Sequence, residues 1–216
     1  MKNKMLSILL VLAASTFANA SEKSNWSVTK NVGLFAYTAD FNLKEGNHSL
    51  GKVVRTGLCT PSYYYDLYDA NNEFQVRGIT RIFSLGLFCD RGMEIDLYEG
   101  QNVIGKIEGQ FLTTSRAKFM MYDFRGRPIV EAHLDDESSN FLIVSCQDGT
   151  PVGELTGKAY GAASIWEMNY INPLLELDDR ILQVFAGFVS DFQKSFIRPP
   201  KEIHHHHQHY HANKDY

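Results

Sequence analysis

The chain has 216 residues, which is enough for one large domain or two small ones. Its formal net charge of −4 argues against nucleic-acid binding through a general basic field. Hydrophobic residues make up 44% of the sequence, so an ordinary buried core is possible.

The first 20 residues have the features of a secretory signal. Lys2 and Lys4 form a positive segment, residues 6–14 are a short apolar run, and Ala18 and Ala20 supply a small-residue cleavage site. We expect cleavage near Ala20 and export to a periplasmic or secreted location, which would take the formal charge to −6. The alternative is an uncleaved anchor, for which the apolar run is short.

Residues 21–31 are polar and are expected to be a loose lead-in to a domain spanning residues 32–198. Between about residues 32 and 157 one unit recurs. It is an alternating strand, a polar turn rich in Asp, Asn and Gly, and a second strand. The copies are residues 41–53, 64–77, 94–107, 118–132 and 141–155.

Three of the copies place a glycine directly after an apolar residue at the start of the second strand: Gly51, Gly105 and Gly153. A glycine at this position suits a bulge or a bend where a sheet must curve tightly. Single hairpins are marginally stable, so we expect all five to pair into one sheet.

Further strands are expected at residues 81–88 and 109–115, which connect the hairpins, and at residues 162–171. The total approaches a dozen strands. A sheet of that size tends to curl or close, which removes its exposed edges.

Residues 179–196 carry the one strong helix pattern after the signal, with Asp178 and Asp179 suited to its first turn. Projected at about 100° per residue, the apolar side chains fill an arc of roughly 200°, wider than a surface helix shows. The residues predicted to form the core face are Ile181, Leu182, Val184, Phe185, Phe188, Val189 and Phe192, together with Ala186 and Phe196.

The width of this arc predicts a helix covered on most sides. A membrane span is rejected because Gln183, Ser190 and Asp191 interrupt the apolar run. The predicted fold is therefore mostly β: a closed or nearly closed antiparallel barrel of about 12 strands that encloses a hydrophobic C-terminal helix. The alternative is a helix packed on one face of a sheet.

The three cysteines, Cys59, Cys89 and Cys146, allow one disulfide and one free thiol in an oxidising compartment. They also fit a role as small buried hydrophobic residues. The sequence contains no C-x-x-C pattern, so neither a redox motif nor a zinc knuckle is indicated.

Catalytic patterns are sparse. Outside the C-terminal tail the histidines are His48, expected in a turn, and His133, expected on a strand. The acidic residues 135–137 form a candidate cation patch, although adjacent acids in a loop are usually solvated. We find neither a glycine-rich phosphate loop nor a nucleophile elbow and therefore expect no enzyme and no cofactor. A hydrolase built around His133 is kept as a third hypothesis.

Residues 199–216 are expected to form a disordered tail after Pro199 and Pro200. Six imidazoles within eight residues can chelate Zn²⁺, Ni²⁺ or Cu²⁺ without the fixed geometry of a selective site. The alternatives are a solvated low-complexity tail or a remnant of expression. The candidate ligands are His204, His205, His206, His207, His209 and His211.

The segments YDLYDANNEF, IDLYEGQNVIGKI, MYDFRGRPI and DGTPVGEL, the strand around Trp166 and the helix LDDRILQVFAGFVSDF together resemble the tubby C-terminal-like superfamily. The similarity is strongest to its LURP-one-related and phospholipid-scramblase branches and covers roughly residues 31–196. It implies a barrel threaded by its C-terminal helix. Tubby proteins bind phosphoinositide head groups and scramblases are linked to lipid movement, so the resemblance implies a lipid or small-ligand partner.

The basic residues of this chain do not match the head-group cluster of tubby proteins and are interpreted as a solvated face. They are Arg77, Arg81, Arg91, Lys106, Arg116, Lys118, Arg125 and Arg127. The sequence thus predicts an exported, non-catalytic binding or interaction protein whose partner is a lipid, a small ligand or a protein. We expect no nucleic-acid partner and no membrane span after cleavage. The alternative function is metal handling through the histidine-rich tail.

Overall fold

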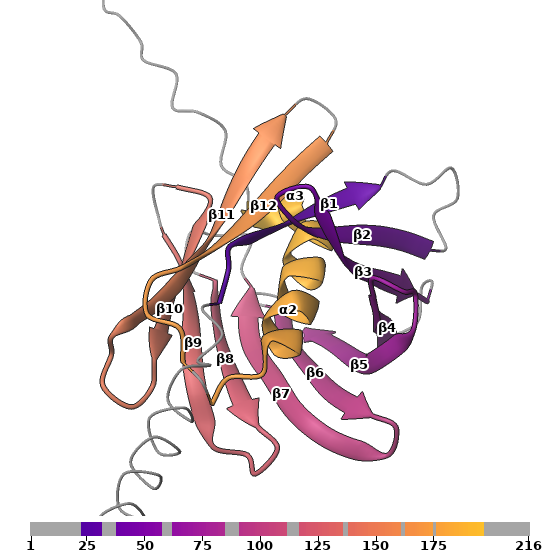
Figure 1. Cartoon of the computed structure of the whole chain (residues 1–216). Coiled ribbons are helices and arrows are strands. Elements are labelled where there is room, and N and C mark those ends of the chain that lie inside the picture. Colours follow the sequence, from indigo (N-terminus) through magenta and orange to yellow (C-terminus); the bar gives the residue numbers. More distant parts are fainter. Residues whose placement is uncertain are drawn as a thin grey trace, which may run out of the picture.

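The computed structural model describes residues 23–31, 38–57, 62–84, 91–111, 117–135, 138–160, 163–174 and 176–196. Twelve antiparallel strands follow one another around a closed barrel in chain order, and the first strand pairs with the last. The C-terminal helix α2 runs inside the barrel (Figure 1). The predicted fold is confirmed.

The barrel is a simple meander, in which each strand pairs with its neighbours in the sequence. The strands are β1 (Trp26–Asn31), β2 (Thr38–Glu45), β3 (His48–Thr56), β4 (Ser62–Asp69), β5 (Phe74–Ser84), β6 (Arg91–Glu99), β7 (Asn102–Phe111), β8 (Lys118–Asp123), β9 (Pro128–Leu134), β10 (Asn140–Ser145), β11 (Pro151–Tyr160) and β12 (Ala163–Tyr170). The helices are α2 (Asp179–Asp191) and the short α3 (Gln193–Phe196).

Alternation along the strands separates a dry interior from a wet exterior. On β2, Ala39, Phe41 and Leu43 are buried, whereas the residues between them are partly exposed. The same period of two recurs on β8 and β10. One continuous apolar core therefore unites the inner wall of the barrel with the helix.

All five predicted hairpins form, and each has an irregularity in its pairing just before the turn. The pairing shifts after Leu43, Leu67, Leu97, Met121 and Ile143. The residues opposite these positions are Gly51, Val76, Gly105, Val130 and Gly153. The recurrent glycines thus lie at bulges, as the sequence predicted, and bulges bend a strand and increase its twist.

The helix α2 is buried on nearly every side. It packs against β1 to β4, β7 and β12, and its aromatic rings meet those of β8 and β10. The predicted core residues Ile181, Leu182, Val184, Phe185, Phe188 and Val189 are buried, and Phe192 is partly buried. The apolar arc underestimates the covered surface, because Gly187 and Ser190, which are outside the predicted core face, are also buried. Gly187 is close to Val53, where a side chain would not fit.

The expected helix over residues 179–196 is divided into two at Phe192. It begins after Asp178, whose carboxylate accepts a hydrogen bond from the backbone N–H of Arg180, and α2 ends at Asp191. Phe192 caps it, and α3 adds one further turn. Phe196 is fully buried and packs on Phe119 and Phe141.

Two expectations about the strands are wrong. The predicted loose lead-in contains β1, which pairs with both β12 and β2 and so closes the barrel. Residues 81–84 and 109–111 are not separate connecting strands but the ends of the long strands β5 and β7. The remainder of the two predicted connecting segments lies outside the described residues.

Polar contacts hold the C-terminal end of α2 in place. At its end, the Asp191 carboxylate meets the Lys30 ammonium at 3.0 Å, the Arg55 guanidinium at 3.0 Å and the Tyr65 hydroxyl at 3.0 Å. Burial, followed by the charge of Asp191, raises the pKa of Tyr65 well above its usual value. Two cations therefore offset the unfavourable position of a carboxylate at the negative end of the helix dipole.

Among the described helices, none has the length and apolarity that a membrane crossing requires.

Candidate functional site

The interior of the barrel is filled by protein. The rings of Phe185 and Phe188 lie against Phe119 with centroids 5.2 and 5.8 Å apart, and Phe141 packs on Phe185 at 5.6 Å. Edge-to-face packing of this kind joins the helix to the inner wall of the barrel in one apolar core. Binding sites are therefore to be sought on the rim and on the outer wall.

A pocket of about 420 Å³ lies at the rim of the barrel, beside the segment that leads from β12 into α2. We call it the rim pocket. Three stretches distant in sequence form it: the start of β9, the end of β10 and the segment that contributes Pro173, Leu174 and Glu176. Its lining residues are Arg127, Pro128, Ile129, Ser145, Cys146, Gln147, Pro173, Leu174 and Glu176.

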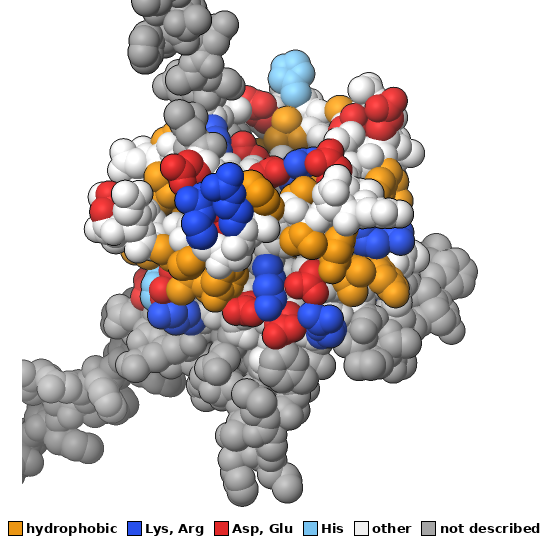
Figure 2. Space-filling view, turned by 90° about the horizontal axis from the view of Figure 1, so that it is seen from below, with side chains coloured by type: hydrophobic (Ala, Val, Ile, Leu, Met, Phe, Trp, Pro, Cys, Tyr) orange, Lys and Arg blue, Asp and Glu red, His pale blue; other side chains and the backbone are white. Residues whose placement is uncertain are grey.

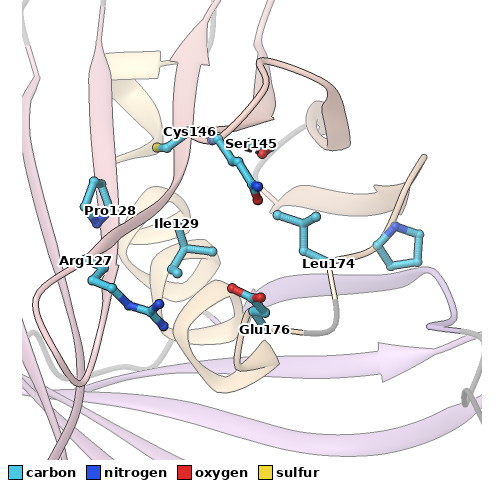
Figure 3. A pocket seen from close by; sticks show the side chains of 9 residues that line it. Arg127, Pro128, Ile129, Ser145, Cys146, Leu174 and Glu176 are labelled. Carbon is cyan, nitrogen blue, oxygen red and sulfur yellow. Dashed lines mark hydrogen bonds between the residues drawn. The ribbon is translucent and has the colours of Figure 1, made fainter.

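The pocket has an apolar middle between polar edges. Figure 3 shows Cys146 and Ser145 at one side, Arg127 and Glu176 at the opposite side, and Ile129 and Leu174 between them. Its volume falls within the range of small-molecule sites, which are mainly apolar with a few polar groups that fix orientation. A small molecule with one apolar and one polar part matches this lining.

Contacts from the N-terminal part of the chain hold one wall of the rim pocket in place. The Lys23 ammonium donates hydrogen bonds to the carbonyl oxygens of Leu174 and Leu177, both at 3.0 Å, and pairs with Asp179 at 2.8 Å. The Tyr170 hydroxyl donates to the same Asp179 carboxylate at 2.8 Å. The linker is thus fixed between β12 and the start of the helix.

The helix cap adds charge near this wall. Arg180 pairs with Asp178 at 2.7 Å and with Glu99 at 3.2 Å. Partial burial opposes ionisation of Asp178, but hydrogen bonds from the Arg180 side chain and backbone outweigh it and hold its pKa below the usual value. The same pair raises the pKa of Arg180.

Cys146 is an exposed free thiol at the edge of the rim pocket. Its Sγ lies 3.3 Å from the Sδ of Met120. Partial burial, followed by the negative charge of Glu131, raises the thiol pKa. Because the thiolate is the reactive form, this environment makes Cys146 a poor nucleophile.

Five of the basic side chains that the sequence singled out are paired with carboxylates on the outer wall. Arg77 pairs with Asp66 at 2.8 Å, Arg81 with Asp96 at 2.7 Å and Arg127 with Asp123 at 2.8 Å. Lys106 pairs with Glu108 and Lys118 with Glu131. Arg125 lies over the ring of Phe124. The structure does not describe the side chain of Arg91 or any part of Arg116.

Three of these pairs, Arg77–Asp66, Arg81–Asp96 and Lys118–Glu131, cross neighbouring strands, and all of the pairs mix the two signs of charge. Figure 2 shows acidic and basic side chains side by side on the face seen from below. Among the described residues, the basic side chains singled out above therefore form a mixed charged surface and not a cationic cluster of the tubby kind. This agrees with their interpretation as a solvated face.

The candidate catalytic residues do not meet in a pocket. His133 lies on the outer face of β9, with Nε2 2.6 Å from Glu131, and it is about half exposed. It lines neither the rim pocket nor the outer cavity described below. His48 is the exposed first residue of β3 and not part of a turn. Asp135 accepts a hydrogen bond from Ser138, and residues 136 and 137 lie outside the described residues.

The metal and disulfide predictions concern residues that the structure does not describe. Cys59, Cys89 and the tail histidines His204 to His211 all lie outside the described residues. In the part of the chain that the structure does describe, no group of three His, Cys, Asp or Glu side chains is close enough to hold a metal ion. Metal binding by the histidine-rich tail thus remains a prediction.

Comparisons with models of known protein families, with characterised proteins and with solved structures find no match for this chain. The resemblance to the tubby C-terminal-like superfamily therefore stays a prediction. Sequence reasoning missed the rim pocket entirely. The strongest signal for this pocket in the sequence is the turn residues before Pro128 and Pro173. They predict that the chain bends at both places, but not that the two bends lie side by side in the fold.

Proposed function

We propose that this protein is a non-catalytic binding protein that holds a small amphiphilic molecule, such as a lipid, in the rim pocket. The observation that carries the proposal is the filled barrel. Because α2 occupies the interior, a ligand has to bind at the rim or on the outer wall. The rim pocket combines a suitable volume with an apolar middle, one neutral polar edge and one edge that carries a charge of each sign.

The chemistry of the lining favours an amphiphile. Ile129 and Leu174 offer apolar contact to a short hydrocarbon segment, while Arg127 and Glu176 offer one charge of each sign to a polar head. Arg127 already shares its charge with Asp123, so a zwitterionic or weakly anionic head fits better than a phosphate cluster. The resemblance to tubby and scramblase proteins supports a lipid.

The arrangement does not favour catalysis. The thiol of Cys146 is held protonated, and His133 lies away from the rim pocket on an open sheet face. General acid–base or nucleophilic catalysis needs these groups within hydrogen-bond reach of a bound substrate. Export after cleavage near Ala20 is part of the same proposal and rests on the pattern of the first 20 residues.

The rim pocket can be tested through its own thiol. We expect a short-chain phosphatidylglycerol to slow maleimide labelling of Cys146. Peptide mass spectrometry measures the labelling, so that Cys146 is distinguished from the other cysteines. Native mass spectrometry of protein purified from its own host should show a retained lipid. The proposal would be contradicted if the lipid gave no protection and the purified protein retained no small molecule.

Matched tryptophan variants locate the effect. Pro128 is exposed in the rim pocket, so Pro128→Trp should fill the pocket and abolish protection. Leu142 is 41% exposed on the outer face of β10, so Leu142→Trp adds the same side chain away from the pocket and should change nothing. Equal protection in both variants would place the ligand elsewhere.

A second candidate function is metal handling through the tail. Its support is the cluster of His204 to His207, His209 and His211, whose imidazoles suit Zn²⁺, Ni²⁺ and Cu²⁺. Calorimetry with each ion should show micromolar binding to the full chain and none to a chain ending at Pro200. Equal binding by both chains would rule out the tail.

A further inference from the structure

A second surface, unrelated to the rim pocket, lies on the outer wall over β4, β5 and β6. Aromatic side chains gather here at outward-pointing positions, next to the ion pairs Arg77–Asp66 and Arg81–Asp96 on the same strands. We call it the aromatic surface, and it consists of Tyr64, Tyr68, Phe74, Arg77, Ile79 and Tyr98.

Strand register brings these side chains together. Tyr64 is opposite Ile79, and Arg77 is opposite Tyr98. The pairing shifts between Leu67 and Tyr68, so that Phe74 and not Gln75 lies opposite Tyr68. The bulge in this hairpin therefore keeps an aromatic ring on the outer face.

The rings form walls of a shallow cavity of about 530 Å³, lined by Tyr68, Phe74, Arg77, Ile79, Tyr98 and Gly100. Tyr68 and Phe74 pack edge to face with centroids 5.9 Å apart. Phe74 is 45% exposed and Tyr64 is 40% exposed, although large aromatic side chains usually lose most of their surface in the core. The exposed rings thus offer flat apolar faces to a ligand.

Arg77 lies in the middle of the aromatic surface. Its guanidinium carbon is 5.5 Å from the Tyr64 ring centre and 5.8 Å from that of Phe74. Its Nε and Nη2 donate to the two oxygens of Asp66 at 2.9 and 2.8 Å. The pair cancels the charge of the site, while the N–H groups of Nη1 are left for another acceptor.

We propose that the aromatic surface binds a neutral carbohydrate. One face of a sugar ring consists of C–H groups with a slight positive charge, which stack on the negative face of an aromatic ring. The ring hydroxyls can accept hydrogen bonds from the remaining N–H groups of Arg77, whose side chain is half exposed. The cancelled charge selects against sulfated and phosphorylated ligands.

A protein partner is the competing occupant, since Tyr, Phe and Arg are frequent in interfaces. A flat protein surface would remove water from the half-exposed Arg77 guanidinium without replacing its hydrogen bonds, which is costly. Sugar hydroxyls replace those water contacts one by one. The half-exposed Arg77 guanidinium in the middle of the rings therefore favours the carbohydrate.

The test uses the full chain and three neutral probes: cellohexaose, chitohexaose and mannohexaose. Saturation-transfer NMR should show transfer from aromatic protons to the C–H protons of at least one probe. Phe74→Ala should weaken that binding by about 10-fold or more, from the loss of one buried aromatic contact. Tyr64→Ala gives a second, independent variant at an exposed position.

Phe124 supplies the matched control. It is 62% exposed and lies 5.0 Å from an arginine, Arg125, but in the β8–β9 turn and outside the cavity. Phe124→Ala should leave binding unchanged. The proposal is overturned if none of the three probes receives transfer at millimolar concentration, if only a heparin hexasaccharide binds, or if Phe74→Ala binds as tightly as the unchanged chain. A photo-crosslinker at position 74 that captures a protein on the living cell and no glycan would also overturn it.

Discussion

At Gly105 the barrel wall touches the enclosed helix. A Cβ atom at this position would lie 2.6 Å from Cδ1 of Ile181 and 2.7 Å from the carbonyl oxygen of Tyr122. The carbonyl belongs to the neighbouring strand β8 and cannot move without disturbing the β7–β8 pairing. Glycine here is therefore required by the close approach of two elements.

We expect Gly105→Ala to lower the free energy of unfolding by about 1–3 kcal/mol, the usual cost of overpacking a core. Urea denaturation followed by tryptophan fluorescence measures it. Combining the change with Ile181→Val, which removes Cδ1, should recover part of the loss. A loss below about 0.5 kcal/mol in the single variant would mean that the contact is not as tight as described.

Asp178 combines a helix cap with an ionic contact to Arg180. Its pKa is lower in the folded state than in the unfolded chain, so the carboxylate stabilises the fold above a pH of about 4 and stops doing so as the pH falls through the folded pKa. Asp178→Asn keeps a cap acceptor but has no charge to lose. The variant should therefore be less stable near neutral pH.

The difference between Asp178→Asn and the unchanged chain should shrink as the pH falls from about 5 to 2, measured by urea midpoints across that range. Parallel curves would show that the charge contributes nothing. Asp178→Ala removes the cap as well and should cost about 1 kcal/mol even in acid.

At the scale of elements, α2 acts as the centre of an aromatic cluster. Phe185 lies 5.2 Å from Phe119 on β8 and 5.6 Å from Phe141 on β10, measured between ring centres. The ring thus connects two strands that do not pair with each other. Removing it leaves a cavity that neither strand can close alone.

We expect Phe185→Ala to destabilise the protein by about 3–5 kcal/mol. Gln183→Ala, on the same helix but at a partly exposed position, should change stability by less than about 0.5 kcal/mol. Thermal and urea unfolding of the two variants provide the comparison. Similar values for both would mean that the helix contributes through its backbone alone.

The sequence predicts the helix and the hairpins because each has a strong local signal. A wide apolar arc predicts an enclosed helix, and Asp, Asn and Gly turns between alternating strands predict hairpins. It missed β1, because only Trp26 and Val28 among its six residues are buried apolar side chains. It divided β5 and β7 because Gly78 and Gly109 interrupt their patterns.

At the scale of the whole molecule, the helix supplies the filling of a closed barrel. A chain ending at Asp178 should lose near-UV circular dichroism and bind a hydrophobic dye, since the inner wall has no other partner. A chain ending at Pro200 keeps α2 and α3 and should stay folded. An unchanged near-UV spectrum in the shorter chain would contradict the role of the helix.

The candidate sites could not be predicted from the sequence, because they depend on how the whole barrel closes. The rim pocket is made from residues 127–129 and 145–147 together with Pro173, Leu174 and Glu176, and these turn and strand residues come together only when the barrel closes. The aromatic surface depends on the shift in pairing at Leu67, and one residue of slip would turn Phe74 inward. Such information resides in register and not in composition.

The β1–β12 seam sets the order in which the molecule can be assembled. Its two strands are separated by more than 130 residues of sequence, and the core they enclose is completed by a helix that leaves the ribosome after both. Contacts of such long range form slowly, and a half-made ring exposes unpaired edges. The nascent chain therefore remains without its native interior until nearly all of it has been synthesised, which is the interval in which a chaperone or a translocation channel can act on it.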